Sequence, residues 1–261
     1  MPDRLASCLR IVTPAEKVAC VHALQTDLRS GGIDLAVDSV RDPINQPGHP
    51  DRPELIPPQQ VPRRRIDTML GRAALVHALA HIEFNAINLA LDAAHRFSGM
   101  PDRYYIDWLT VADEEALHFD LLSTHLTTLG YAYGDFPAHN GLWEMAVKTA
   151  HDPLVRMALV PRVLEARGLD ATPLIVGKLK AANDARMIDI LAQIERDEVS
   201  HVAIGTYWFA WLCRAQGVDP DTRFRELLIE YDAPPLKPPF NLDARRAAGF
   251  SEAELAWLKS L

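Results

Sequence analysis

Residues 111–119 read VADEEALHF and residues 197–201 read DEVSH, and these two stretches decide the fold. Each contains a glutamate followed three residues later by a histidine: Glu115 with His118, and Glu198 with His201. Residues three apart lie on one face of an α-helix. Because apolar residues surround both pairs at helical spacing, the sequence predicts charged side chains on the buried faces of two helices.

Two further glutamates complete a repeating pattern. Glu83 lies within the apolar stripe of a predicted helix, and Glu165 lies near the end of another. Glu115 follows Glu83 by 32 residues, and Glu198 follows Glu165 by 33 residues. The chain is therefore expected to contain two similar halves, each with one glutamate helix and one Glu-x-x-His helix.

This combination of side chains predicts a metal centre. A single uncompensated buried carboxylate costs several kcal/mol, so four of them must be neutralised by protons, cationic side chains or metal. One glutamate from each of two helices and a Glu-x-x-His from each of two others is the ligand set of four-helix di-iron and di-manganese carboxylate proteins. Oxygen and imidazole donors without thiolate suit iron(II) or manganese. We expect two iron ions, with manganese as the alternative, held by Glu83, Glu115, His118, Glu165, Glu198 and His201.

Helix signals cover most of the chain, and no stretch has the alternating pattern of a strand. Capping residues, glycines and prolines set the expected boundaries. Helices are predicted between Thr13 and Gly31, at 66–97, 101–129, 142–167 (interrupted at Pro153 and Pro161 and ended by Gly168), from Thr172-Pro173, at 185–216, after Asp219-Pro220, and from the Ser251-x-x-Glu254 box.

The expected fold is all-α, with a four-helix bundle in residues 66–217. Residues 1–65 would contribute an N-terminal helix and a proline-rich strap that begins at Asp42, packed on the core. Residues 218–261 would form a C-terminal helical extension.

The composition is that of a soluble globular protein, with 261 residues, 48% hydrophobic and 24% charged. The net charge of −8 argues against nucleic-acid binding. Arg4 and Arg10 interrupt the first apolar stretch, and no window approaches 18 uncharged apolar residues, so neither a signal sequence nor a membrane span is expected. Cys8, Cys20 and Cys213 are odd in number and widely spaced, which predicts no disulfide framework and a cytoplasmic location.

Five stretches of the sequence carry a family resemblance: 111–119, 133–143 (YGDFPAHNGLW), 159–173 (LVPRVLEARGLDATP), 197–201 and 233–241 (APPLKPPFN). They closely resemble a bacterial family of uncharacterised ferritin-like proteins, and the resemblance covers nearly the whole chain. It implies a ferritin-like four-helix bundle, alongside rubrerythrin, bacterioferritin and the tRNA-hydroxylating di-iron monooxygenases, whose ligand pattern matches the six residues above. Pro161 and Arg162 depart from that pattern near Glu165, so Glu144 is the alternative third-helix ligand.

Acidic residues also stand next to the predicted ligands. Glu114 and Asp197 each precede a motif glutamate. A ligating histidine usually donates its other ring N–H to a carboxylate, so we predict that Glu114 orients His201 and that Asp197 orients His118. Glu195, one turn before the second motif, is either an additional ligand or proton carrier, or a solvated acid.

A loop near the centre of the chain is a candidate substrate pocket. His139, Asn140, Gly141, Leu142 and Trp143 are followed by Glu144. This loop would either cover the metal site and contact a substrate, or form a rigid turn around a buried tryptophan.

The functional hypothesis is a dinuclear oxidoreductase that uses oxygen or peroxide to oxidise an unknown small molecule. The alternatives are a ferroxidase or iron-handling protein, and a non-catalytic scaffold whose buried acids pair with arginines. The sequence therefore does not decide whether the protein is an enzyme. A homodimer is favoured because two-fold symmetric oligomers are the commonest.

Overall fold

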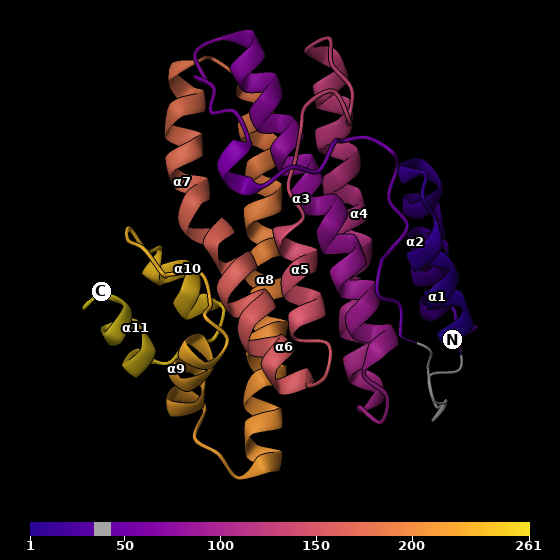
Figure 1. Cartoon of the computed structure of the whole chain (residues 1–261), viewed down its shortest axis with the longest axis vertical. Coiled ribbons are helices and arrows are strands. Elements are labelled where there is room, and N and C mark those ends of the chain that lie inside the picture. Colours follow the sequence, from indigo (N-terminus) through magenta and orange to yellow (C-terminus); the bar gives the residue numbers. More distant parts are fainter. Residues whose placement is uncertain (34–42) are drawn as a thin grey trace. The chain divides into compact units, whose positions relative to one another are not determined.

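A computed structural model describes residues 1–33 and 43–261. Within these ranges the protein is all-α, and the β-structure consists of one isolated bridge between Leu55 and Ala138. The helices form two compact units, Met1–Glu144 and Met145–Leu261 (Figure 1). The all-α prediction is confirmed.

The first unit is built on a long helix pair. α3 (Met69–Arg96) and α4 (Asp102–Thr128) pack along each other (Figure 1), within three residues of the predicted boundaries. Thr68 caps α3 by accepting a hydrogen bond from the Gly71 amide. Every residue from Glu83 to His95 is buried, so this part of α3 is covered on all sides.

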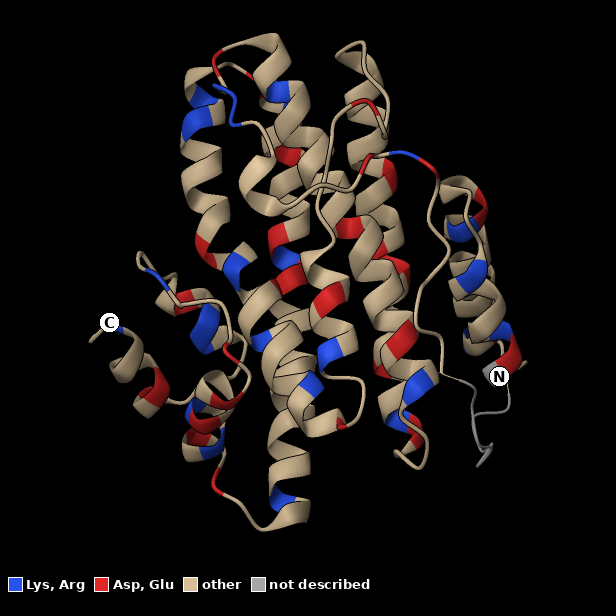
Figure 2. Cartoon of the chain, viewed as in Figure 1, with Lys and Arg blue, Asp and Glu red and all other residues tan. Residues whose placement is uncertain are grey.

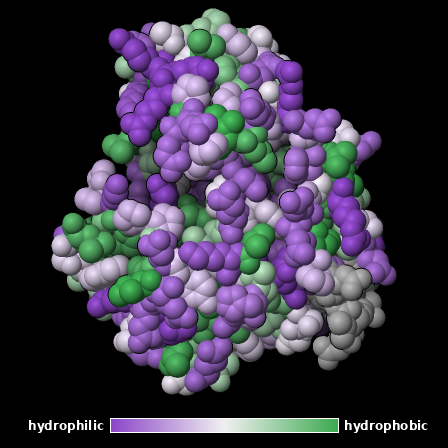
Figure 3. Space-filling model, in the orientation of Figure 1, coloured by the Kyte–Doolittle hydropathy of each residue, from purple (hydrophilic) through white to green (hydrophobic). Residues whose placement is uncertain are grey.

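The length and composition of α3 would also allow it to cross a membrane, although 72% of its most apolar stretch is buried inside the structure. Such burial is typical of a core helix in a bundle. Hydrophilic and hydrophobic residues are interspersed over the face of the molecule in Figure 3.

Two short helices precede this pair. α2 (Pro14–Arg29) was expected and packs on α4, whereas α1 (Pro2–Arg10) was not expected and packs on α3. Charged residues interrupt the apolar pattern of α1 in the sequence, so its apolar face was not recognised. Leu5 and Leu9 lie on that face and are fully buried.

Cys8 on α1 and Cys20 on α2 are joined by a disulfide. The prediction that the cysteines form no disulfide was therefore wrong. The helices bring the two Cα atoms to 5.8 Å, within the usual range for a disulfide. The sequence separation of 12 residues does not show that Cys8 and Cys20 are close in space, because their distance depends on how α1 and α2 pack together.

The proline-rich strap is irregular as predicted, apart from one short turn, η1 (Pro58–Gln60). Its expected first residue, Asp42, lies outside the described residues. Backbone hydrogen bonds fasten the strap to the loop before α5, from Ile56 N to Ala138 O (2.9 Å) and from Ala138 N to Glu54 O (2.9 Å). The strap is thus an integral part of the first unit.

Lys17 joins the elements of the first unit. It is fully buried on α2, and its Nζ donates to Leu9 O (3.2 Å), Gly48 O (2.8 Å) and Asn88 Oδ1. These acceptors belong to α1, the strap and α3. The three acceptors match the three N–H donors of an ammonium group.

The second unit is built around α8 (Ala185–Gln216), whose boundaries are those predicted. Asp184 caps its start by accepting from the Met187 amide, and Gly217 ends it in the left-handed conformation. Four helical segments lie between α4 and α8 in the sequence. They are α5 (Gly141–Lys148), α6 (Pro153–Leu159), the π-helical segment η2 (Val160–Glu165) and α7 (Ala166–Ala181). The boundary between the two units falls within α5.

The prediction that Gly168 ends a helix and that Thr172-Pro173 starts another was wrong, because α7 runs through all three residues. Pro173 has no N–H to donate to the Leu169 carbonyl four residues earlier. The Asn241 side chain donates to that carbonyl instead, at 3.3 Å. The helix therefore continues because a distant side chain replaces the missing bond.

The C-terminal part of the second unit contains α9 (Pro220–Glu230), α10 (Leu242–Ala247) and α11 (Glu252–Leu258). The predicted starts of α9 and α11 are confirmed, including the capping box of Ser251 and Glu254, whereas α10 was not predicted. Basic and acidic residues both occur on α9 and α10, and acidic residues alone on α11 (Figure 2). They form exposed ion pairs such as Arg246 with Glu252.

Gly205 allows η2 to pack closely against α8. A Cβ atom on Gly205 would lie 2.3 Å from both Cβ and Cγ of Pro161. No other residue type fits at this crossing without moving one of the two helices. Pro161 is one turn before Glu165, and Gly205 is one turn after His201, so this contact also sets the spacing of two predicted ligand helices.

We expect Gly205→Ala to lower the free energy of unfolding by about 1–3 kcal/mol, because the added methyl overpacks the contact with Pro161. The matched control is Gly177→Ala on α7, where a Cβ meets no atom within 4 Å and the helix gains by about 0.5–1 kcal/mol. Urea unfolding followed by circular dichroism measures both. Equal effects of the two substitutions would contradict the close-packing argument.

We expect the stability of the wild type to rise from pH 7 to pH 9 relative to a Lys17→Met variant. Burial lowers the pKa of Lys17 from its usual 10.5 to about 7, so in this range the unfolded chain binds a proton that the folded chain does not. The free energy of unfolding then increases with pH, by up to about 1.4 kcal/mol per unit. Urea titrations at three pH values, with exposed Lys180→Met as control, test this, and parallel profiles would contradict it.

Candidate metal centre

Three ligand-type side chains meet inside the first unit. Glu83 comes from α3, and Glu115 and His118 come from one face of α4. His118 Nδ1 lies 3.4 Å from Glu115 Oε2 and 3.5 Å from Glu83 Oε2, and potential ligand atoms of the three residues lie within 4.8 Å of one another. These atoms are close enough together to bind one ion.

The three side chains are almost completely buried. Glu115 and His118 are 0% exposed and Glu83 is 5% exposed. The sequence prediction placed each of them on a buried helix face, and the structure confirms those positions. Charged groups at such depth need compensation from protons or from a cation.

Protons provide that compensation when no ion is bound. Burial, together with charge repulsion and hydrogen bonding from the neighbouring Glu115, raises the pKa of Glu83 to about 8. Burial disfavours the charged form of His118, but hydrogen bonds and attraction to Glu115 and Glu83 outweigh it and raise its pKa to about 11. A metal ion would displace these protons, because it binds neutral imidazole and ionised carboxylate.

Aromatic side chains next to the cluster residues in sequence pack on a loop tyrosine. Phe84 and Phe119, each next to a cluster residue in sequence, contact the ring of Tyr133 with centroid distances of 5.7 and 5.1 Å. The Tyr133 hydroxyl is hydrogen bonded to His81 Nδ1 at 2.8 Å, and burial raises the pKa of Tyr133. These rings therefore join α3, α4 and the loop that contains Tyr133.

The second unit contains the other Glu-x-x-His pair. On α8, His201 Nδ1 lies 3.3 Å from Glu198 Oε1. His201 is completely buried, and the Glu198 side chain is 13% exposed. The i and i+3 spacing thus brings the two groups together on a mostly buried face, as it does for Glu115 and His118.

Glu165 is the last residue of the π-helical segment and is partly buried. π-helical turns are rare and are frequent at functional sites. Arg162, one turn earlier, pairs with Glu254 and is surrounded by aromatic rings. Their centroids lie 4.2 to 4.9 Å from its guanidinium carbon, and they belong to Phe209, Phe224 and Phe250.

Three further acids of the sequence prediction are less buried than the cluster residues. Glu114, Asp197 and Glu195 are half-buried. The predicted orientation of His201 by Glu114 and of His118 by Asp197 stays a prediction.

The candidate substrate loop is partly structural. Trp143 is buried and its Nε1 donates to Asn45 O at 3.0 Å, which ties the loop to the strap. His139 and Glu144 are exposed. The loop contacts α3 through its backbone, since the His139 carbonyl lies 3.1 Å from His81 Nε2.

Sequence reasoning did not single out Tyr133, and it gave His81 no more than a structural role. Tyr133 lies in an irregular loop, where no periodicity indicates which side chain turns inward. His81 precedes Glu83 by two residues and is buried, but it lies before the part of α3 that is covered on all sides, and its neighbour Ile82 is exposed, so the helical period gave no clear signal for it.

Comparison with known proteins places the chain in a family of unknown function. The profile of a family described as "Protein of unknown function (DUF455)" matches residues 10–256. An uncharacterized protein of Haemophilus influenzae is 45% identical over 266 residues, which cover 98% of this chain and 92% of the relative. No solved structure matches the chain.

We expect the affinity of the cluster for iron(II) or manganese(II) to increase between pH 6 and pH 8, by about tenfold per unit for each proton displaced. The raised pKa values of Glu83 and His118 are the cause, since both groups must lose a proton to bind an ion. Competition with a chromogenic chelator measures the affinity, and titration in weak buffer measures released protons. An affinity that does not change with pH would contradict the assignment of these ligands.

Proposed function

This chain belongs to the DUF455 family, and we propose that it is an oxidoreductase with a dinuclear metal centre, with iron as the preferred metal and manganese as the alternative. Its reaction would be the oxidation of a small organic substrate with oxygen or peroxide. The observation that carries the proposal is the contact of Glu83, Glu115 and His118 in a buried position on two packed helices.

The proposed ligands are the six residues of the sequence prediction. Glu83, Glu115 and His118 come from the first unit, and Glu165, Glu198 and His201 come from the second. Support comes from the chemistry within each unit: each has a Glu-x-x-His pair with the histidine ring nitrogen 3.3 to 3.5 Å from a carboxylate oxygen. The matching helix spacing in the two halves of the sequence is the second argument, and it favours a ferritin-like four-helix bundle.

The donor set fits iron or manganese. Carboxylate and imidazole donors without a thiolate suit these metals, and six protein ligands for two ions leave positions open for an oxidant. Bound iron would supply the electron transfer that lets oxygen or peroxide react with an organic molecule.

The residues of the chain itself would control the access of water. Phe84 and Phe119, each next to a proposed ligand in sequence, pack with Tyr133 and would limit the entry of water. The Tyr133 hydroxyl is hydrogen bonded to the His81 ring, which holds Tyr133 against these two rings. His81 is itself held by the Asn85 side chain, at 3.1 Å from its Nε2.

We expect wild-type protein loaded anaerobically with iron(II) and desalted to retain nearly two metal ions per chain, and Glu115→Gln to lose at least half of them. The substitution keeps the shape of the side chain and removes its charge. Asp120→Asn is the matched control, since Asp120 is an exposed acid on the same helix. Elemental mass spectrometry measures the metal, circular dichroism checks folding, and oxygen consumption after reduction tests for redox activity.

Two outcomes would overturn the proposal at different levels. Negligible metal in the wild type would identify the buried acids as a proton-compensated ionic cluster in a non-catalytic protein. Two metals per chain without oxygen or peroxide consumption would retain the centre and reject the oxidoreductase.

A further inference from the structure

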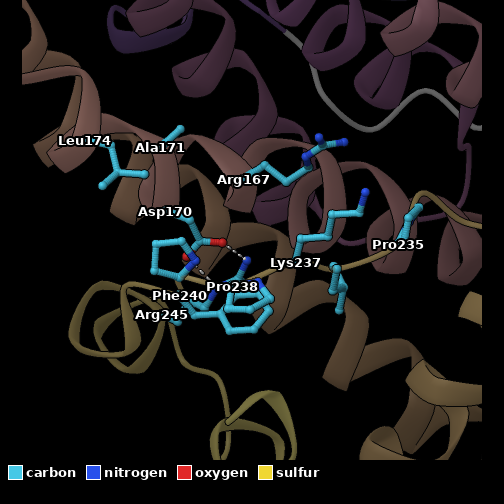
Figure 4. A pocket seen from close by; sticks show the side chains of 11 residues that line it. Arg167, Asp170, Ala171, Leu174, Pro235, Lys237, Pro238, Phe240 and Arg245 are labelled. Carbon is cyan, nitrogen blue, oxygen red and sulfur yellow. Dashed lines mark hydrogen bonds and ion pairs between the residues drawn. The ribbon is translucent and has the colours of Figure 1, made fainter. Parts of the chain in front are cut away.

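The second unit contains a pocket of about 190 Å³ at α7, α10 and the proline-rich segment 235–240 (Figure 4). Three cationic side chains line it, together with one acid: Arg167 and Asp170 from α7, Lys237 from the segment, and Arg245 from α10. None of these residues belongs to the proposed metal ligands. The pocket therefore needs its own explanation.

Asp170 is the only acidic residue of the lining, and both of its carboxylate oxygens already accept hydrogen bonds from neighbouring residues. Asp170 Oδ1 accepts from Arg245 Nε (3.0 Å) and from the Asn241 amide (2.8 Å), and Oδ2 accepts from Arg245 Nη2 (2.6 Å). This ion pair is drawn with dashed lines in Figure 4. Asp170 and Arg245 thus cancel each other in charge.

Arg167 and Lys237 remain as uncompensated charges. Both are exposed, and neither has an ion-pair partner within residues 1–33 and 43–261. In Figure 4 their cationic ends lie on the same side of the pocket. Their charges give the pocket a local excess of two positive charges in a chain whose net charge is −8.

A buried donor in the pocket lining also lacks an acceptor. Arg245 is 1% exposed, and its Nη1 has no hydrogen-bond partner within the described residues. An unsatisfied buried donor costs about 1–3 kcal/mol, more when the group is charged. The rings of Phe240 and Phe250, whose centres lie 5.4 and 5.1 Å from the Arg245 guanidinium carbon, offset part of this cost, so Arg245 acts as a fixed part of the pocket wall.

The rest of the lining is mainly apolar and sets the size of the ligand. Leu174 and Leu236, Pro238 and Phe240 contribute hydrocarbon surface. A cavity of about 150 Å³ is sufficient for benzene, so this pocket has room for a body of that size. A ligand with a charged group alone would leave the apolar surface exposed to water.

We propose that this pocket binds a small organic carboxylate, with an apolar body of about the size of a benzene ring. Guanidinium groups recognise carboxylates through paired hydrogen bonds, and an ammonium group adds attraction without a fixed geometry. Arg167 and Lys237 hold the carboxylate, and Leu174 and Phe240 contact the body. The site is separate from the proposed oxidoreductase activity and requires no metal.

Isothermal titration calorimetry of the full chain with benzoate tests the proposal. We expect benzoate to bind at one site per chain, and at least tenfold more tightly than benzyl alcohol, which lacks the charge, or acetate, which lacks the ring. An Arg167→Gln/Lys237→Gln variant should lose at least tenfold in affinity. The matched control is Lys178→Gln/Lys180→Gln, which removes two charges from exposed positions of α7 outside the pocket.

Absence of benzoate binding, equal binding of benzyl alcohol, or an equal loss in both double variants would overturn the proposal. Equal binding of acetate would overturn the role of the apolar walls. Glu115→Gln should bind benzoate like the wild type, because that substitution affects the metal cluster alone. Failure of the metal centre and failure of this pocket are therefore distinguishable.

Discussion

The burial of two carboxylates and an imidazole between α3 and α4 constrains the first unit more than any other feature. Glu83, Glu115 and His118 are at most 5% exposed, and such groups are stable only in contact with each other and with protons or a cation. Their mutual distances fix the register of the two helices, since a shift of one residue would turn a charged group into apolar surroundings. Chemistry and packing are thus set by the same three side chains.

The surrounding elements maintain this arrangement from outside. The Lys17 ammonium lies 5.1 Å from the centre of the Phe84 ring, next to Glu83, and is hydrogen bonded to three separate segments of the first unit. Trp143 ties the central loop to the strap in the same way. The strap thus lacks regular structure but has defined contacts, because side chains and short backbone bonds replace the regular hydrogen bonds of a helix.

The long helices were predictable because each has a strong apolar period and clear ends. Asp184 and Gly217 mark both ends of α8, and the Ser251 box marks the start of α11.

The wrong predictions have one physical origin. In each case the local structure depends on contacts with residues that are distant in the sequence. Pro173 predicts a helix start from local rules, and only the contact with Asn241 shows why α7 continues. The Cys8 and Cys20 pair likewise depends on the packing of α1 on α2, and the partner of Arg162 lies 92 residues away. Within the candidate site, spacing predicted which acids are buried, whereas the inward turn of Tyr133 from a loop had no periodic signal.

The bond between Asn241 and the Leu169 carbonyl has a consequence for how the chain is made. A growing chain emerges from the ribosome N-terminus first, so α7 is synthesised some 70 residues before the side chain that completes its backbone bonding at Pro173. During that interval the Asn241 side chain is not yet available to this carbonyl, which Pro173 also leaves without its usual backbone donor. The hydrogen bonding of α7, and the side of the pocket that α7 forms, are therefore complete only after almost the entire chain has been translated.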